Sequence, residues 1–567
     1  IQLFAGSNRQ MLLQQPFASY QSSLTNILHA GAGTAGKIDS VTVLWNSGKI
    51  EVLYNLRADS TYVLQEKNAK KTDQLRLLNQ PIFNPQPERL TGHQQELIND
   101  FKRQTQLITP QSFFGPVIET ADLNRDGLID FVVGGTALQL PAVMLQQKEG
   151  KFINSNQPAL KILQGIETGA LLLEDLDKDG DTDLYHAAGG YGLLEPDDER
   201  LTDHVFLNDG KGNLNPAPAL PSLRKTSRSC AVAIDLDGDP LPDLFVGSRL
   251  LPGNFPIIPR SHVLKNLGGG KFQDATDNYP ELAGAGMIAD GIFIDVNNDN
   301  KKELILVGNW MPVRVFNFNG NQCQESTTQF FADSPKGLWN SITAVDFNKD
   351  GNIEIVLGNL GMNSQLRVNP NEPLELFAKD FDGNGAVDPM LTHYVMGKHV
   401  LFATRDEMLD QMTMMRTRFT DYASFADAVW KDVFSTDEMK NVSSFKVTQL
   451  HTSMFSWTAK DKFIEVQLPL EVQSFPVFTS SGFDADGDGN TDLLFFGNIH
   501  HARLRLGNMD AGMGLMLKGN GDLTFKALKP EQTGLWLKGD IRSSAVINNQ
   551  LIVGINNSGV YAVKPKK

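Results

Sequence analysis

Short apolar runs alternating with polar turns dominate the chain. Residues 131–134, 244–247, 304–308, 355–358 and 493–497 are rich in Val, Ile, Leu and Phe, and each run ends in glycine. Runs of this length and composition predict buried strands rather than helices. A second apolar run usually precedes the first, as at 231–234 and 342–345. The recurring unit is therefore a strand, a polar loop and a strand.

The polar loop between the two runs is an acidic nonapeptide. It recurs seven times, beginning at Asp122, Asp175, Asp235, Asp295, Asp346, Asp380 and Asp484. A glycine-turned hairpin often follows it, as at 204–214, 262–272 and 514–525. Four strands per unit, with the first five loops 53, 60, 60 and 51 residues apart, are typical of β-propeller blades.

The chain is therefore predicted to be all-β, with a propeller of seven or eight blades. Two features leave the number open. Residues 539–554 look like a unit without the acidic loop, whereas the step from Asp346 to Asp380 is too short for a full blade.

Three segments depart from the repeat. Residues 1–75 are predicted to be a small β module, with strands in 40–53 and 61–65, and residues 76–110 are predicted to connect it to a propeller over 111–567. Residues 403–445 carry apolar side chains at helical spacing and predict a helical insertion. Its methionine-rich face either packs against the propeller or lines a groove for a partner. That face comprises Met408, Leu409, Met412, Met415, Phe419, Tyr422, Phe425 and Val429.

Composition narrows the function classes. The net charge of −15 argues against a nucleic-acid surface, and no run of 18 apolar residues predicts a membrane span. Two cysteines, Cys230 and Cys323, allow one disulfide or two free thiols. Because residue 1 is Ile and no signal peptide is visible, we expect a fragment or a processed form.

The acidic loops have the donor pattern of calcium sites. Positions 1, 3, 5 and 9 are always Asp, Asn or Glu, and five of the seven loops have Gly at position 6. Calcium prefers six to eight oxygen ligands, which carboxylates at alternate positions and a backbone carbonyl at position 7 supply. Up to seven calcium ions would bring the net charge of −15 to about −1. The loops lacking Gly at position 6, those of Asp235 and Asp295, are predicted to be the weakest.

The predicted calcium ligands at positions 1, 3, 5, 7 and 9 are Asp122, Asn124, Asp126, Leu128 and Asp130; Asp175, Asp177, Asp179, Asp181 and Asp183; Asp235, Asp237, Asp239, Leu241 and Asp243; Asp295, Asn297, Asp299, Lys301 and Glu303; Asp346, Asn348, Asp350, Asn352 and Glu354; Asp380, Asp382, Asn384, Ala386 and Asp388; and Asp484, Asp486, Asp488, Asn490 and Asp492.

Two other interpretations of the loops compete with calcium binding. An EF-hand needs Glu at position 12 and flanking helices, but that position is Val, His, Leu or Phe here and the predicted flanks are strands. A metal-free Asp/Asn/Gly turn suits any single loop. It suits seven loops less well, since clustered carboxylates repel one another unless a cation lies among them.

These motifs resemble the FG-GAP/VCBS repeats of integrin α-subunits and bacterial surface proteins. Residues 28–33 and 41–48 resemble the ASPIC/UnbV module, which accompanies such propellers in cartilage acidic protein and in long secreted proteins of Bacteroidetes. Residues 308–312, 337–341 and 358–364 also resemble that bacterial group. The resemblance implies calcium-loaded propellers in an extracytoplasmic setting, and binding rather than catalysis. It implies no particular ligand.

A ligand face is predicted opposite the acidic loops, because residues just before the first strand and just after the second lie there. The residues singled out for binding a glycan or a surface protein are Trp310, Trp339, Asn340, Arg228 and Arg249. Packing of the two tryptophans between blades is the alternative. The expected function is calcium-stabilised binding or adhesion. A calcium-dependent polysaccharide lyase or hydrolase is the second hypothesis.

Overall fold

The computed structural model describes residues 1–6, 8–15, 17–19, 22–23, 25–71, 80–458 and 462–566. They form two compact units, Ile1–Gln80 and Pro81–Lys567. Among these residues, no helix is both long enough and apolar enough to cross a membrane.

The first unit is a small β module. Its main sheet has the order β2-β1-β5-β6-β7, from β1 (Gln2–Ala5), β2 (Asn8–Met11), β5 (Lys37–Leu44), β6 (Lys49–Arg57) and β7 (Lys70–Lys71). A separate pair is formed by β3 (Phe17–Ser19) and β4 (Ser22–Ser23). Ile38, Val41 and Val43 of β5 are buried with Leu3. The prediction of a strand over residues 61–65 was wrong, because these residues lie in no strand. Of the five, only Leu64 packs against this core, and β7 forms the edge of the sheet.

The second unit is built from repeated four-stranded antiparallel sheets, so the all-β prediction is confirmed. The acidic loop joins the first two strands of each sheet except the last. The sheets, in chain order, are β9 (Ile118–Ala121), β10 (Asp130–Val133), β11 (Ala142–Gln147) and β12 (Lys151–Ser155); β13 (Glu167–Glu174), β14 (Asp183–Gly189), β15 (His204–Asn208) and β16 (Leu214–Pro216); β17 (Ser227–Ile234), β18 (Asp243–Leu250), β19 (His262–Asn266) and β20 (Phe272–Asp274); β21 (Met287–Ile294), β22 (Glu303–Pro312), β23 (Arg314–Asn319) and β24 (Gln322–Glu325), with β25 (Lys336–Leu338) beside β22; β26 (Ser341–Val345), β27 (Glu354–Gly358), β32 (Ser453–Thr458) and β33 (Lys462–Val466); β34 (Val477–Phe483), β35 (Asp492–Gly497), β36 (Leu515–Gly519) and β37 (Phe525–Leu528); and β38 (Ile541–Ile547), β39 (Gln550–Ile555), β40 (Gly559–Val563) and β8 (Glu88–Gly92).

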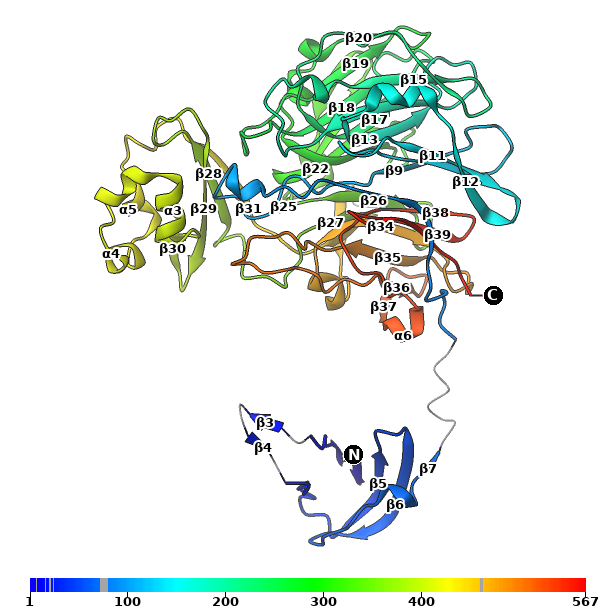
Figure 1. The fold of residues 1–567 in the computed structure, drawn as a ribbon, viewed down its shortest axis with the longest axis vertical. Coiled ribbons are helices and arrows are strands. Elements are labelled where there is room, and N and C mark those ends of the chain that lie inside the picture. The colour runs from blue at the N-terminus through cyan, green and yellow to red at the C-terminus, as the bar shows by residue number, and fades with distance from the viewer. Residues whose placement is uncertain are drawn as a thin grey trace. The chain divides into compact units, whose positions relative to one another are not determined.

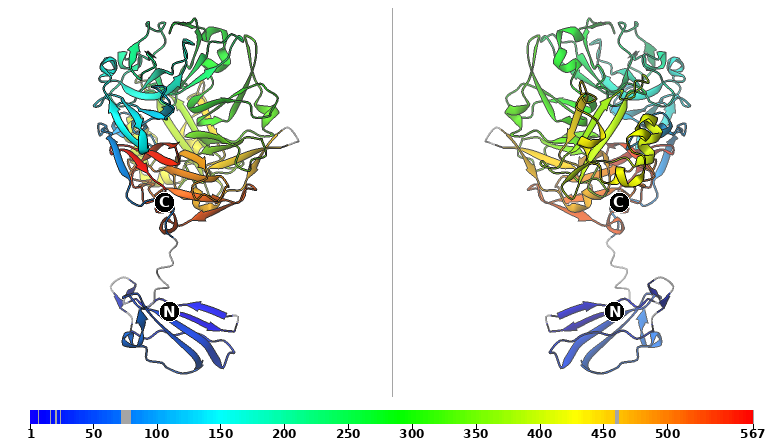
Figure 2. Two further views of the ribbon diagram at one scale, coloured as in Figure 1. Left: turned by 90° about the vertical axis from the view of Figure 1, so that its right-hand side faces the viewer. Right: turned by 90° about the vertical axis from the view of Figure 1, so that its left-hand side faces the viewer.

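The first strands of these sheets contact one another in a closed cycle, β9-β13-β17-β21-β26-β34-β38 and back to β9. Within the described residues, seven sheets are joined in this way, and Figure 2 shows them arranged around a common axis. The second strands are buried on both faces, as in β10, β14, β27 and β35. Because apolar side chains of neighbouring sheets meet there, hydrophobic burial between sheets holds the ring together.

The last sheet closes the ring with two distant parts of the chain. β8 pairs with β40, with Gly92 opposite Gly559 and Thr91 opposite Val560. Residues 88–92, expected to belong to the connection, therefore supply the outer strand of the seventh sheet. Phe83 and Pro565 form a further bridge between the same two chain segments.

An inserted segment separates β27 from β32. It forms a sheet of its own in the order β30-β29-β28-β31, from β28 (Leu374–Lys379), β29 (Asp388–Val395), β30 (Lys398–Leu401) and β31 (Ser443–Val447). The Asp380 loop joins β28 and β29, so it lies outside the ring, and this explains the short step from Asp346. Figure 1 shows the insertion in yellow, beside the ring.

The predicted helical insertion is present as α3 (Arg405–Gln411), η8 (Thr413–Thr417), α4 (Tyr422–Ala426) and α5 (Trp430–Val433). The methionines of its apolar face are buried, whereas Tyr422 on the same face is exposed. Met408, Met412 and Met415 pack with Met390 of β29 and with Trp430, inside the insertion itself. Of the two interpretations of these methionines, the structure therefore supports packing, although the packing partner is the inserted sheet and not the ring.

Short helices complete the described residues. They are α1 (Pro280–Ala283), α2 (Thr327–Phe330), α6 (Pro530–Thr533), η1 (Glu66–Asn68), η3 (Asp100–Lys102), η4 (Lys148–Gly150), η5 (Pro158–Leu163), η6 (Glu199–Leu201), η7 (Thr276–Asn278) and η9 (Leu470–Ser474). Cys230 and Cys323 are free thiols.

Candidate functional site

The seven acidic loops share one backbone conformation. In every loop the N–H of position 7 donates to the side chain of position 5, over 2.7–2.9 Å. Position 4 has a left-handed backbone in every loop, as at Arg125 (φ 57°) and Gly487 (φ 79°). Repetition of these features in seven different sequences indicates that the acidic side chains themselves set the turn.

Position 6 decides how fully the turn closes. In six loops its N–H donates to the carboxylate of position 1, over 2.8–3.1 Å. Asn300 does so with φ 65°, because asparagine tolerates the left-handed region. The prediction that the Asp295 loop is weak was therefore wrong in geometry. Pro240 has no N–H to donate, so only the Asp235 loop lacks this bond.

The carboxylate at position 9 ties each loop to its sheet. It is buried in all seven loops, and one oxygen accepts from the N–H of position 2 over 2.9–3.3 Å. In four loops the other oxygen accepts from a backbone N–H of the third strand, as Asp183 does from Asn208 over 2.8 Å. Burial, and to a smaller extent the neighbouring carboxylates of Asp177 and Asp179, raise the pKa of Asp183 to about 7.

A pair of substitutions separates this structural role from metal binding. Asp183→Asn is expected to destabilise the protein by about 1–3 kcal/mol even in EGTA, because a buried N–H of Leu176 or Asn208 loses its acceptor. Asp177→Asn, at position 3, should change only the calcium-dependent part of stability. Urea unfolding with and without calcium measures both. Equal costs in EGTA would contradict the distinction.

Four loops bring three carboxylates within 4.8 Å of one another. These groups are Asp175, Asp177 and Asp183; Asp235, Asp237 and Asp243; Asp380, Asp382 and Asp388; and Asp484, Asp486 and Asp488. In the other three loops an asparagine at position 3, Asn124, Asn297 or Asn348, replaces one carboxylate. All of these donors are hard oxygen atoms, the type that calcium prefers.

Two buried oxygen atoms in the loops have neither a hydrogen-bond partner nor an ion pair within the described residues. They are Oδ1 of Asp175, at position 1, and Oε1 of Glu303, at position 9. A third, Oδ1 of Asp181 at position 7, has no hydrogen-bond partner but forms an ion pair with Arg125 over 2.5 Å. An unpaired buried carboxylate oxygen is costly, because it has lost its water and gained no donor. A cation in the loop would satisfy both atoms, so the donor set fits a calcium ion.

Lysines from the third strand occupy two of the loops. Lys265 of β19 pairs with Asp237, and Lys518 of β36 pairs with Asp486 and, over 2.7 Å, with Asp488. The hydrogen bond from Lys518 lowers the pKa of Asp488, and the two aspartates raise the pKa of Lys518. A calcium ion that enters either loop would have to displace the ammonium group from its aspartate partners.

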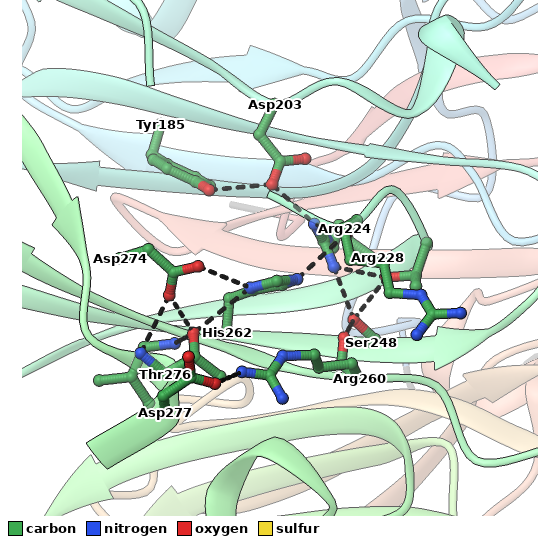
Figure 3. A network of polar contacts seen from close by, with 12 residues as sticks. Tyr185, Asp203, Arg224, Arg228, Ser248, Arg260, His262, Asp274, Thr276 and Asp277 are labelled. Carbon is green, nitrogen blue, oxygen red and sulfur yellow. Dashed lines mark hydrogen bonds and ion pairs between the residues drawn. The ribbon is translucent and has the colours of Figure 1, made fainter. Parts of the chain in front are cut away.

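The predicted ligand-face residues do not form one surface. Trp339 is fully buried between the fourth and fifth sheets, beside Val313 and Ile355. Arg228 is also buried, and its guanidinium is fully engaged: it pairs with Asp203 over 3.1 Å and donates to Thr226 and Ser248 (Figure 3). A small cavity lies on the ring axis, at the end of the ring opposite the acidic loops, and neither of these two side chains lines it.

The other three ligand-face residues, Trp310, Asn340 and Arg249, do line that cavity. Trp310 is nearly buried, in an apolar cluster that joins the ring end to Leu374 and Leu391 of the inserted sheet. The inserted sheet thus covers part of the ring end that the sequence predicts to be an open face. Arg542 of β38, which the sequence analysis did not single out, lines the same cavity.

Family models match segments in both units of the chain. The family model described as ASPIC and UnbV matches residues 1–71, and that of the FG-GAP-like repeat matches residues 175–246 and 295–357. The second matches span four of the acidic loops, those beginning at Asp175, Asp235, Asp295 and Asp346.

Two solved structures illustrate the more distant likeness. The V. cholerae biofilm matrix protein Bap1 is 12% identical, with 85% of this chain and 92% of that chain covered and a TM-score of 0.33. Saccharomyces cerevisiae Sqt1 is 10% identical, with 84% and 99% covered and a TM-score of 0.37. Likenesses this remote carry no functional argument. The chain thus contains an N-terminal domain that matches ASPIC and UnbV, followed by repeats that match the FG-GAP-like model.

Proposed function

We propose that this protein is a calcium-binding β-propeller that acts outside the cytoplasm as a binding or adhesion module, with its calcium ions mainly structural. The unpaired buried oxygens of Asp175 and Glu303, in loops with further acidic donors, carry the calcium half of the proposal. Each ion would neutralise a turn whose carboxylates otherwise repel one another.

The exposure of the loops supports a location outside the cytoplasm. Positions 3 and 5 are exposed or half-buried, so these ligands keep contact with water and favour modest affinity. Extracellular calcium modules have dissociation constants of about 10⁻⁴–10⁻³ M. Sites of that affinity fill at the calcium levels found outside the cytoplasm, which supports an extracytoplasmic location.

The binding role is tested with a glycan array and a panel of surface proteins, each probed with and without calcium. Calcium-dependent capture without turnover is the expected result. Turnover of a polysaccharide on the array would instead support the lyase or hydrolase hypothesis, and capture that EGTA leaves unchanged would contradict a role for calcium in holding the binding surface.

Removal of the built-in ammonium of Lys518 should strengthen calcium binding by the Asp484 loop. Lys518→Met frees Asp486 and Asp488 from their ion pairs, so the entering cation no longer displaces a lysine. We expect affinity at this site to rise by about three- to tenfold, as for the loss of one nearby like charge. Calorimetric titration of calcium measures it.

Lys526 provides the matched control for this variant. It lies opposite Lys518 in the pairing of β36 with β37, and its side chain is exposed. Lys526→Met should leave the titration unchanged. If Lys518→Met binds calcium no more tightly than the wild type, the lysine is not competing with the metal ion.

A further inference from the structure

A cavity of about 40 Å³ lies where five sheets converge at the end of the ring opposite the acidic loops. Residues 108–114 lie along one side of it, and the ends of β18, β22, β34 and β38 contribute side chains to the rest. Its polar side chains include Arg249 and Arg542. No aspartate or glutamate is among the described residues that line it.

The two arginines differ in how their charges are balanced. Arg542 stacks on Phe478, pairs with Asp540 over 3.1 Å and donates to the backbone oxygens of Phe113 and Asn498. Arg249 stacks on Phe114, but among the described residues its guanidinium makes no hydrogen bond or ion pair, and its buried Nε has no partner. Burial, and then the like charge of Arg542, lower the pKa of Arg249 well below its ordinary value.

Arg249 is half-buried, and its Nε lies out of reach of water without a hydrogen-bond partner, so the charge has no counter-charge, which is unfavourable. The planar guanidinium is suited to two parallel hydrogen bonds with an oxyanion. An anion that enters the cavity would supply the missing partner.

Trp310 supplies a second observation at the same place. It lines the cavity and has a left-handed backbone with φ 61°, a conformation that is strained for a bulky residue. Strained backbone conformations of this kind cluster at ligand sites, where the surrounding structure enforces them. The indole N–H of Trp310 also has no hydrogen-bond partner among the described residues, so it is free to donate.

We propose that this axial cavity binds a small oxyanion through the guanidinium of Arg249. The volume limits the ligand: the cavity has room for roughly three waters, which suits one carboxylate or sulfate group but not a sugar ring. The site deepens the proposed binding role by naming the chemical group that is recognised. It does not depend on the calcium loops.

Sodium sulfate and sodium acetate, titrated separately, test the site and distinguish an inorganic oxyanion from a carboxylate. Sodium chloride at matched ionic strength is the blank. We expect saturable heat and a change in tryptophan fluorescence with at least one of the two anions. The fluorescence change should disappear in Trp310→Phe. Arg249→Met should weaken binding by about tenfold or more, the usual loss for a charge-assisted hydrogen bond, and Arg249→Lys by less.

Two controls keep the test decisive. Arg260→Met removes an arginine that pairs with the exposed Asp277, and it should leave anion binding unchanged. In anion-free buffer Arg249→Met should melt at or above the wild-type temperature, because a half-buried charge without a counter-charge is removed. Equal binding by Arg249→Met, no saturable response to either anion, or a large fall in its melting temperature would each overturn the proposal. A calcium titration on the same samples reports separately on the loops.

Discussion

Chelation of calcium should lower the melting temperature of residues 81–567 by about 10 °C. At free calcium 100-fold above the dissociation constant, each ion bound only by the folded state adds about 2.7 kcal/mol. The four loops with three clustered carboxylates would together contribute about 11 kcal/mol. A unit of this size has an unfolding entropy of about 1 kcal/mol per degree at its midpoint, which gives the expected shift.

Differential scanning calorimetry in calcium, in EGTA and after calcium is restored measures this effect. Magnesium is the informative control. It demands near-ideal octahedral geometry and keeps its waters, so it should recover less of the shift than calcium does. A melt that EGTA leaves unchanged would remove the calcium half of the proposed function.

The second large effect is expected from the buried ion pair between Arg228 and Asp203. Both side chains are about 1% exposed, and the oxygens of Asp203 also accept from Tyr185 over 3.0 Å and from the N–H of Ala188 over 2.8 Å (Figure 3). Asp203→Ala leaves the guanidinium buried without a counter-charge. The expected loss of unfolding free energy is about 3–5 kcal/mol.

The double variant Asp203→Leu with Arg228→Met should recover most of that loss, because no charge then remains buried. Asp277→Ala is the matched control. It breaks a pair between Arg260 and an aspartate that is 95% exposed, so it should cost less than about 1 kcal/mol. Denaturant unfolding compares the variants. A double variant as unstable as Asp203→Ala would mean that the lost hydrogen bonds, not the charge, decide the cost.

The acidic loops could be predicted because their chemistry is local. Nine consecutive residues carry the donors and the turn, and the left-handed position 6 is Gly or Asn in six of the loops, as at Gly127 and Asn300. The sheet to which a loop belongs is not local. β27 pairs with β32 across the whole inserted segment, so the Asp380 loop reads as one more member of the ring although it lies in the inserted sheet.

The ligand face shows the same limit. Placing Trp310 and Arg249 opposite the loops follows from strand direction alone, and the structure agrees. The covering of that end by Leu374 and Leu391 depends on tertiary packing that no local pattern encodes. The acidic residue at position 9 has two roles, of which the sequence indicates only one. Its type suggests a metal ligand, but only the structure shows that in four loops its oxygen also accepts a hydrogen bond from a backbone N–H of the third strand.

The pairing of β8 with β40 has a consequence for biosynthesis. A ribosome makes residues 88–92 long before residues 559–563, so the seventh sheet waits for its last partner until nearly the whole chain has emerged. Contacts this distant in sequence slow folding. Until then the apolar flanks of the first and sixth sheets are uncovered. A chaperone or an export machine would therefore have time to bind the nascent polypeptide before the seventh sheet closes the ring.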